Sequence, residues 1–187
     1  ANSGSYDFYL ALHSNGSTNG SGEGTVRGVI AFYYPTSANG RRAADIFVQG
    51  LKEIYPLPDK VYAMATTTLG EVRQPYMPSV LLELGYHDNT ADALWVENNI
   101  QAIAANLVQS LTTYFGLPFV TPLTPWQGTV RTPQGGSLNL RAAPGTRADV
   151  VALLPNGAGI TVYGRYQEWY TVGYNGKLGY AYADFIT

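Results

Sequence analysis

The sequence predicts an α/β domain followed by a small all-β domain, and three observations support this prediction. Over residues 1–116, short apolar runs alternate with long segments of helical periodicity, as in helices packed on a sheet. Residues 127–187 hold only short strand-like runs separated by turns. Between these two parts, residues 117–126 carry three prolines and are predicted to form a semi-rigid linker.

Three apolar runs in the first part are predicted strands. YDFYLAL (6–12) ends at His13, and GVIAFYY (28–34) is apolar and aromatic. SVLLEL (79–84) is continuously apolar, which is typical of a buried central strand. SNGSTNGSGEG (14–24) is rich in residues that tolerate positive φ, so a flexible loop is expected there.

Two segments have the periodicity of amphipathic helices. In residues 38–55 the apolar side chains recur at helical spacing, at Ala43, Phe47, Leu51 and Ile54. In residues 90–115 they recur at Leu94, Ile100, Ile103, Leu107, Leu111 and Phe115. Asn89 or Thr90 can cap the start of this second helix, and Gly116 ends it.

Composition excludes several classes of function. The 187 residues carry a net charge of −2, which gives no reason to expect a nucleic acid or an anionic membrane as partner. The absence of cysteine excludes disulfides, thiolate zinc sites and cysteine nucleophiles. No run is long enough to cross a bilayer, and the first residues, ANSGSYDF, do not resemble a signal peptide.

Two residues have positions that suit catalysis. His13 lies where a strand ends and a loop begins, and ligands bind at such strand ends in open α/β sheets. Glu83 lies within an apolar strand, where a carboxylate is costly unless it is paired or bound to a metal. A carboxylate beside a metal-activated water is the arrangement that hydrolysis needs. Each residue alone has a structural alternative, because a lone histidine is often structural and a buried glutamate often pairs with an arginine.

The order of motifs resembles a known family. DFYLALHSN, RGVIAFYY, RRAADIF and MPSVLLELGYHDNTADALWV together resemble a zinc-dependent N-acetylmuramoyl-L-alanine amidase. The resemblance runs over about residues 2–115 and is most specific in PSVLLELGYHDN. It implies the α/β sheet of an amidase with flanking helices, and cleavage of the amide between N-acetylmuramic acid and L-alanine in peptidoglycan. It also implies that His13 is a zinc ligand and that Glu83 is the catalytic acid/base.

The resemblance leaves the metal site incomplete. Catalytic zinc takes about three protein ligands, and the family supplies a further His and Glu from segments upstream of the HSN motif. We interpret His87 as a loop or supporting residue and Asp7 as unable to reach the metal. The expectation is therefore an amidase domain without its N-terminal part, inactive by itself, with a non-covalent N-terminal fragment of the same protein supplying the missing ligands.

The C-terminal part resembles a bacterial SH3-like domain. The resemblance covers about residues 127–187, through SLNLRAAPG, DVVALLPNGAGITVYG and EWYTVGYNGKLGYAYADFIT. It implies a small β-barrel that binds cell-wall peptide or glycan. Most strand aromatics of such a domain are expected in its core. Tyr163, Tyr166 and Trp169 are the candidates for an exposed stacking surface.

Two functions follow from these resemblances. The first is a zinc peptidoglycan hydrolase, acting outside the cell or in the cell wall, with a phage endolysin also possible. The alternative is a non-catalytic wall-binding adaptor or an inactive amidase fragment, since only one zinc ligand is identified. Glu83 favours the enzyme, and the missing ligands favour the adaptor.

Overall fold

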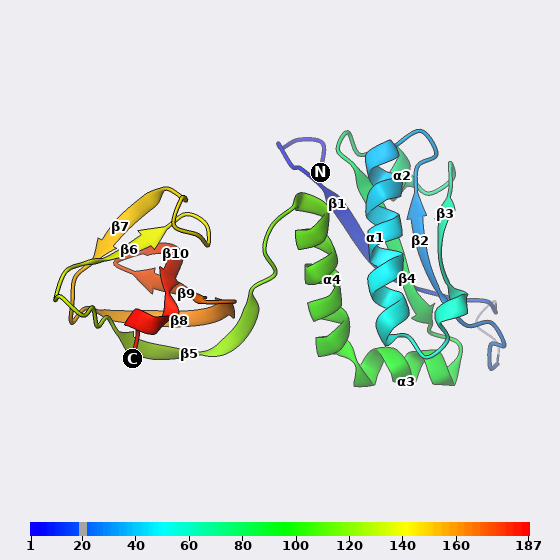
Figure 1. The fold of residues 1–187 in the computed structure, drawn as a ribbon. Coiled ribbons are helices and arrows are strands. Elements are labelled where there is room, and N and C mark those ends of the chain that lie inside the picture. Colours follow the sequence, from blue (N-terminus) through cyan, green and yellow to red (C-terminus); the bar gives the residue numbers. More distant parts are fainter. Residues whose placement is uncertain (19–21) are drawn as a thin grey trace. The chain divides into compact units, whose positions relative to one another are not determined.

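The computed structural model describes residues 1–18 and 22–187, which form two compact units (Figure 1). The first unit spans Ala1–Leu117 and the second spans Pro118–Thr187. None of the helices in the described part of the chain is long and apolar enough to cross a membrane.

The first unit is built on a four-stranded mixed sheet of order β1-β4-β2-β3. Its strands are β1 (Tyr9–Asn15), β2 (Val29–Tyr33), β3 (Val61–Ala65) and β4 (Ser79–Tyr86). β1 runs parallel to β4, and β2 runs parallel to β3, whereas β2 and β4 are antiparallel. The apolar run that contains Glu83 therefore lies inside the sheet, between β1 and β2.

Two long helices cover one face of this sheet (Figure 1). They are α1 (Ala38–Ile54) and α4 (Ile100–Phe115), and α3 (Thr90–Asn98) precedes α4. Phe47 and Leu51 of α1 pack with Val80 and Leu82 of β4 in the main core, where all four are fully buried. Apolar side chains at helical spacing on α1 thus meet every second residue of the central strand, which is the packing that the two periodicities predict.

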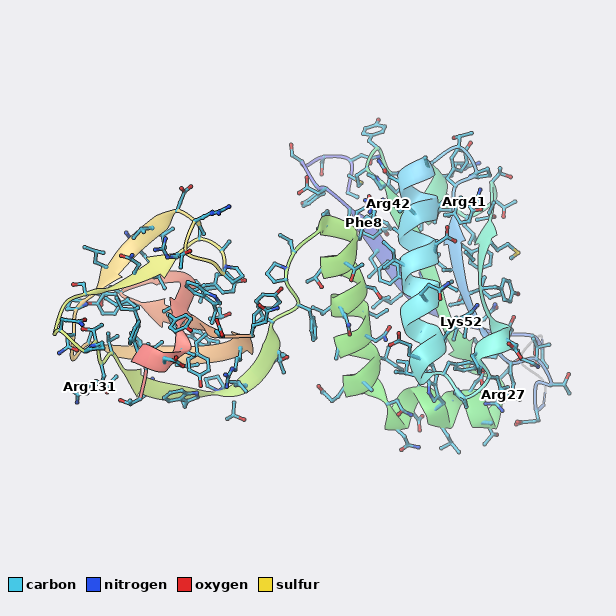
Figure 2. The ribbon with its side chains drawn as sticks, viewed as in Figure 1. Phe8, Arg27, Arg41, Arg42, Lys52 and Arg131 are labelled. Carbon is cyan, nitrogen blue, oxygen red and sulfur yellow. The ribbon has the colours of Figure 1, made fainter. Side chains whose placement is uncertain are left out.

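The aromatic end of α4 closes this core against the start of the sheet. The rings of Phe8 and Tyr114 lie with their centroids 5.0 Å apart. The Arg42 guanidinium lies 4.2 Å from the centroid of the Tyr114 ring, and Figure 2 shows Phe8 and Arg42 at the same end of the unit. Both guanidinium NH groups of Arg42 donate to the Tyr114 carbonyl oxygen at 3.2 Å, so the α4 C-terminus is tied to α1.

The opposite face of the sheet carries a much shorter helix, α2 (Gly70–Arg73). Val72 of α2 is 2% exposed and packs with Ala11 and Leu81 in a separate small cluster. The sequence did not predict α2 or β3, because both are short and lie between stronger patterns. α2 nevertheless matters for the site described below.

The predicted elements are present with shifted limits. The strand expected to end at Leu12 continues through His13 to Asn15, and the helix expected over 90–115 is two helices. Asn99 breaks it with φ −125° and ψ 19°, where the backbone leaves the helical conformation. Of the loop predicted over 14–24, residues 19–21 lie outside the described residues.

The second unit is a six-stranded antiparallel sheet of order β5-β8-β9-β10-β6-β7. Its strands are β5 (Thr121–Thr129), β6 (Leu138–Arg141), β7 (Val150–Leu154), β8 (Gly159–Tyr166), β9 (Trp169–Tyr174) and β10 (Lys177–Tyr182). A 3₁₀ turn, Ala183–Phe185, follows β10. The core is aliphatic, with Leu140, Leu154, Val162 and Val172 completely buried.

Part of the predicted linker lies in a strand of this sheet. Residues 121–126 belong to β5, which pairs Thr121 with Arg165 and Pro122 with Gly164. β5 lies at the edge of the sheet, where proline is tolerated because no neighbour needs its missing N–H. The ladder becomes irregular between Pro122 and Trp126, so the prolines shape an edge strand and not a free connection.

Candidate active site

The two residues singled out by the sequence lie side by side. His13 of β1 is the direct register partner of Glu83 on the parallel strand β4. Side chains alternate along a strand, and Leu82 and Leu84 point into the core under α1. Glu83 and His13 therefore project from the opposite face, which α2 covers only in part.

Glu83 carries an unsatisfied polar atom on this face. Its side chain is half-buried, and its Oε2 is buried with no hydrogen-bond partner among the described residues. Burial raises the pKa of Glu83, the charge of nearby Glu71 raises it further, and His13 and His87 lower it in part. A carboxylate with a raised pKa and an unused oxygen is suited to take a proton from a bound reactant.

Glu71, which sequence reasoning missed, contacts the predicted metal ligand directly. The Glu71 Oε1 lies 3.1 Å from the His13 Nε2, and the two side chains are 41% and 43% exposed. Glu71 sits on α2, 58 residues from His13 in the chain. No local pattern in the sequence links the two, because the contact depends on how α2 docks on the sheet.

His87 supports the loop after β1, as predicted. Its Nδ1 lies 3.2 Å from both the hydroxyl and the carbonyl oxygen of Ser14. The ring also packs closely on Gly16, where a Cβ atom would meet the His87 Nε2 at 3.1 Å. The imidazole is thus engaged with loop backbone, and Asp7 is an exposed residue outside β1.

The segment after β4 holds this loop in place. The Asp88 carboxylate accepts hydrogen bonds from the backbone N–H groups of Ser17 at 2.7 Å and Thr18 at 2.6 Å. Burial by itself raises the pKa of Asp88, but these hydrogen bonds outweigh it and lower the pKa to about 2. The Asn89 side chain donates to the Gly24 carbonyl at 2.6 Å, so both described ends of the loop are tied to the turn after Glu83.

A buried carboxylate shapes the end of β4. Asp92 is completely buried and accepts hydrogen bonds from the Tyr55 hydroxyl at 2.6 Å, the Arg27 Nε at 2.8 Å, and the N–H groups of Gly28 and Tyr86 at 3.1 Å. Figure 2 shows Arg27 at the α3 end of the unit. The strand reaches this anchor through a glycine of positive φ at position 85 (84°), a backbone conformation that explains the glycine in the LELG motif.

The described residues do not form a complete metal site. Among residues 1–18 and 22–187, no group of three or more His, Cys, Asp or Glu side chains is arranged to hold a metal. His13 is nevertheless an exposed imidazole beside two carboxylates, and nitrogen and oxygen donors of this kind suit zinc. The orphaned Oε2 of Glu83 is consistent with a polar group bound next to it.

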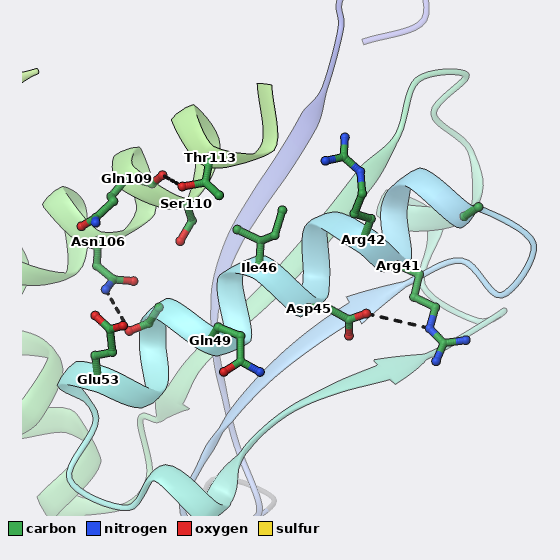
Figure 3. Close-up of a pocket in the computed structure, with 12 residues that line it drawn as sticks. Arg41, Arg42, Asp45, Ile46, Gln49, Glu53, Asn106, Gln109, Ser110 and Thr113 are labelled. Atoms are coloured by element: carbon green, nitrogen blue, oxygen red, sulfur yellow. Dashed lines mark hydrogen bonds and ion pairs between the residues drawn. The ribbon is translucent and has the colours of Figure 1, made fainter. Parts of the chain in front are cut away.

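A hollow between α1 and α4 does not belong to this site. It has a volume of about 630 Å³, and Figure 3 shows its lining residues on α1 and α4. These two helices cover the face of the sheet opposite to His13 and Glu83. Most of the residues that line it have polar or charged side chains, and the Asn106 amide donates to the Gly50 carbonyl at 2.9 Å across the helix contact. Neither His13 nor Glu83 lines it, so its size does not indicate the reacting centre.

The predicted wall-binding residues of the second unit do not share one surface groove. Trp169 lines a groove of about 480 Å³ together with Tyr182 and Phe185. The Trp169 and Tyr182 rings meet edge to face at 5.6 Å, and the Tyr182 and Phe185 rings are 5.7 Å apart. Tyr163 lines a different groove of about 320 Å³, and Tyr166 lines neither of these two. Sequence reasoning did not identify Tyr182 and Phe185, because it could not tell which aromatics would face the same side.

Comparisons with known proteins match both units. The family described as N-acetylmuramoyl-L-alanine amidase matches residues 1–113, and the family described as bacterial SH3 domain matches residues 136–187. No curated protein matches the chain.

Solved structures show a similar fold. The N-acetylmuramoyl-L-alanine amidase from Clostridium difficile 630 has a TM-score of 0.53 at 18% identity, covering 62% of this chain and 61% of that one. The CwlD amidase from Clostridioides difficile, solved with the GerS lipoprotein, has a TM-score of 0.52 at 17% identity, covering 59% and 55%. The catalytic domain of the CD27L endolysin targeting Clostridia difficile has a TM-score of 0.51 at 26% identity, covering 60% and 57%. The chain thus spans between 55% and 61% of the length of these structures.

Proposed function

Because this chain belongs to the N-acetylmuramoyl-L-alanine amidase family, we propose that it is the catalytic and wall-binding part of a zinc peptidoglycan hydrolase. The bond cleaved is the amide between N-acetylmuramic acid and the L-alanine of the stem peptide. The observation that carries this proposal is the register pairing of His13 with Glu83 on one open face of the sheet. The site of action is the cell wall, reached from outside the cell or, for an endolysin, during lysis.

In this proposal His13 holds zinc and Glu83 moves the proton. Zinc, when bound, lowers the pKa of water at its open position and polarises the substrate carbonyl. Glu83 accepts the proton of the attacking water and returns it to the leaving amine of L-alanine. The raised pKa of Glu83 suits both the uptake and the release of the proton. The Glu83 carboxylate binds a proton more readily than an exposed carboxylate does, and it can still release that proton.

We also infer that the complete site takes ligands from polypeptide outside these 187 residues. Catalytic zinc takes about three protein ligands, and the described residues hold no group of that size. The expected sources are a histidine and a glutamate of an N-terminal piece of the same protein, bound non-covalently if the chain is separate. On this proposal the isolated chain binds zinc weakly and does not hydrolyse peptidoglycan. Without the missing ligands it would act only as a wall-binding adaptor, which is the alternative function.

The test compares the natural polypeptide that contains these residues with its Glu83→Gln variant. Purified peptidoglycan is digested, and new N-terminal alanine is measured together with bound zinc. The variant should keep its zinc and lose about 10²–10⁴-fold in rate, the usual contribution of a positioned acid/base group. Parental rates in the variant would refute the role of Glu83, and products cut at another bond would refute the amidase assignment.

A further inference from the structure

Among the residues that the structure describes, Glu71 is the one whose side chain forms a hydrogen bond with the proposed metal ligand His13. The 3.1 Å contact joins Glu71 Oε1 to His13 Nε2, while His13 Nδ1 makes no hydrogen bond within the described residues. The two nitrogens of this ring therefore have different surroundings, and that difference decides which of them can bind a metal.

The backbone of Glu71 is held in place by the packing and hydrogen bonds of the residues around it. Val72, the next residue, is 2% exposed and packs against the sheet beside β1 and β4. The Ser79 hydroxyl at the start of β4 donates to the Val72 carbonyl at 3.1 Å.

The segment that follows α2 is held as well. The Asn2 side chain donates to the Gln74 carbonyl at 2.8 Å and accepts from the Tyr76 N–H at 3.0 Å. α2 and the segment after it are thus fastened at several points, so the Glu71 backbone is fixed next to His13.

We propose that Glu71 is a positioning residue that holds His13 as the tautomer protonated on Nε2, which leaves the Nδ1 lone pair to bind the metal. An ionised carboxylate can only accept hydrogen bonds, and a neutral imidazole has one N–H donor and one acceptor nitrogen. The Nε2–Glu71 contact therefore requires the proton on Nε2. A carboxylate on the nitrogen that does not bind metal fixes the ring and makes the other nitrogen a stronger donor.

This inference rests on the proposed metal role of His13, but its first test does not need a metal. The metal-free chain is labelled with ¹⁵N, and the tautomer of His13 is determined by NMR near neutral pH, with His13→Asn used to assign its signals. In the parent, Nε2 should carry the proton. Glu71→Ala should give a mixture of the two tautomers and leave the His87 signals in place. Glu97→Gln, on the exposed side of α3, is the matched control and should change neither histidine.

The second test uses ¹¹³Cd as the metal in the natural polypeptide that contains the chain. Coupling between ¹¹³Cd and His13 Nδ1 supports the proposal, with Glu71→Ala binding cadmium about 10–100-fold more weakly, the usual effect of losing such a partner. Glu71→Gln, whose amide oxygen can still accept from Nε2, should recover part of the affinity and keeps the test valid if the alanine variant does not fold. Coupling to Nε2, or a His13 tautomer that does not respond to Glu71→Ala, would overturn it. If the parent polypeptide has His13 protonated on Nε2 as expected but does not hydrolyse peptidoglycan, that result would instead contradict the proposed function.

Discussion

At the scale of single residues, Glu83 lies where its carboxylate weakens the fold, and we propose that the same position serves catalysis. An ionised carboxylate on an otherwise apolar strand loses hydration, and its Oε2 finds no partner among the described residues. Because burial raises its folded-state pKa, the folded protein binds the proton more tightly than the unfolded chain does. Unfolding then releases a proton in the pH range between the two pKa values, so this group makes the protein less stable as the pH rises through that range.

Replacing Glu83 by glutamine should therefore stabilise the protein at neutral pH. The gain should vanish below about pH 4, where the carboxyl is protonated in both states and resembles the amide. Thermal unfolding of parent and variant between pH 3 and 8 measures the effect. The exposed Glu97→Gln serves as the control and should be nearly neutral throughout. A variant that is less stable than the parent at pH 7 would show that the Glu83 carboxylate has a stabilising partner.

At the scale of elements, the site depends on how the ends of strands and helices are joined. The start of α3 carries Asp92, which binds α1 through Tyr55, the entry to β2 through Gly28, and the end of β4 through Tyr86. Burial alone raises the pKa of Asp92, but the hydrogen bonds from Tyr55, Arg27 and the backbone outweigh it, so the folded-state pKa is lowered. The ionised form is thus part of the folded structure.

Removing this anchor should be among the most damaging single changes in the first unit. Asp92→Ala should lower the free energy of unfolding by about 3–5 kcal/mol, because it leaves the partly buried Arg27 and several donors unpaired. The parental contribution should be complete above about pH 4 and lost as the pH falls through the lowered folded-state pKa. Urea unfolding at pH 7 and at pH 3 checks both statements. An equal difference between parent and variant at the two pH values would contradict the ionised role of Asp92.

At the scale of the whole molecule, the chain holds two units with separate cores. The core cluster of the second unit is formed by residues within 126–186. Strands β5 to β10 of this unit form one six-stranded sheet. The groove of Trp169, Tyr182 and Phe185 combines aromatic walls with polar residues such as Asn139, which suits a short peptide or glycan segment. Attaching such a unit to a hydrolase raises the local concentration of substrate.

Residues 118–187 should therefore fold by themselves and sediment with insoluble peptidoglycan. Trp169→Ala should reduce the bound fraction about tenfold, since stacked aromatics dominate such contacts. Tyr163→Ala, at a second predicted wall-binding residue in the other groove, tests that groove separately and should reduce binding less than Trp169→Ala. The opposite ranking of the two variants would move the binding surface to the Tyr163 groove. A folded unit that stays in the supernatant would remove the wall-binding role altogether.

The sequence by itself determined the architecture of this protein and indicated two candidate site residues. Helical and strand periodicities indicated the α/β unit and the all-β unit, and both family matches confirm the resemblance to an amidase and a bacterial SH3 domain. His13 and Glu83 could be predicted as site residues because each lies in a short motif beside a strand end, where local chemistry is unusual. The zinc site and the wall-binding residues inferred from those motifs stay predictions.

Only the tertiary structure decided which distant side chains meet. Glu71 reaches His13 because α2 docks on the far face of the sheet, and no periodicity marks a four-residue helix. Tyr182 and Phe185 join Trp169 because antiparallel pairing and a 3₁₀ turn bring them to one groove, whereas Tyr163 is directed elsewhere. The prolines of residues 117–126 indicated a linker, but Pro122 and Pro125 lie in the edge strand β5. Local patterns report the conformation of the backbone, whereas these contacts depend on register and docking, which are set by the packing of the whole unit.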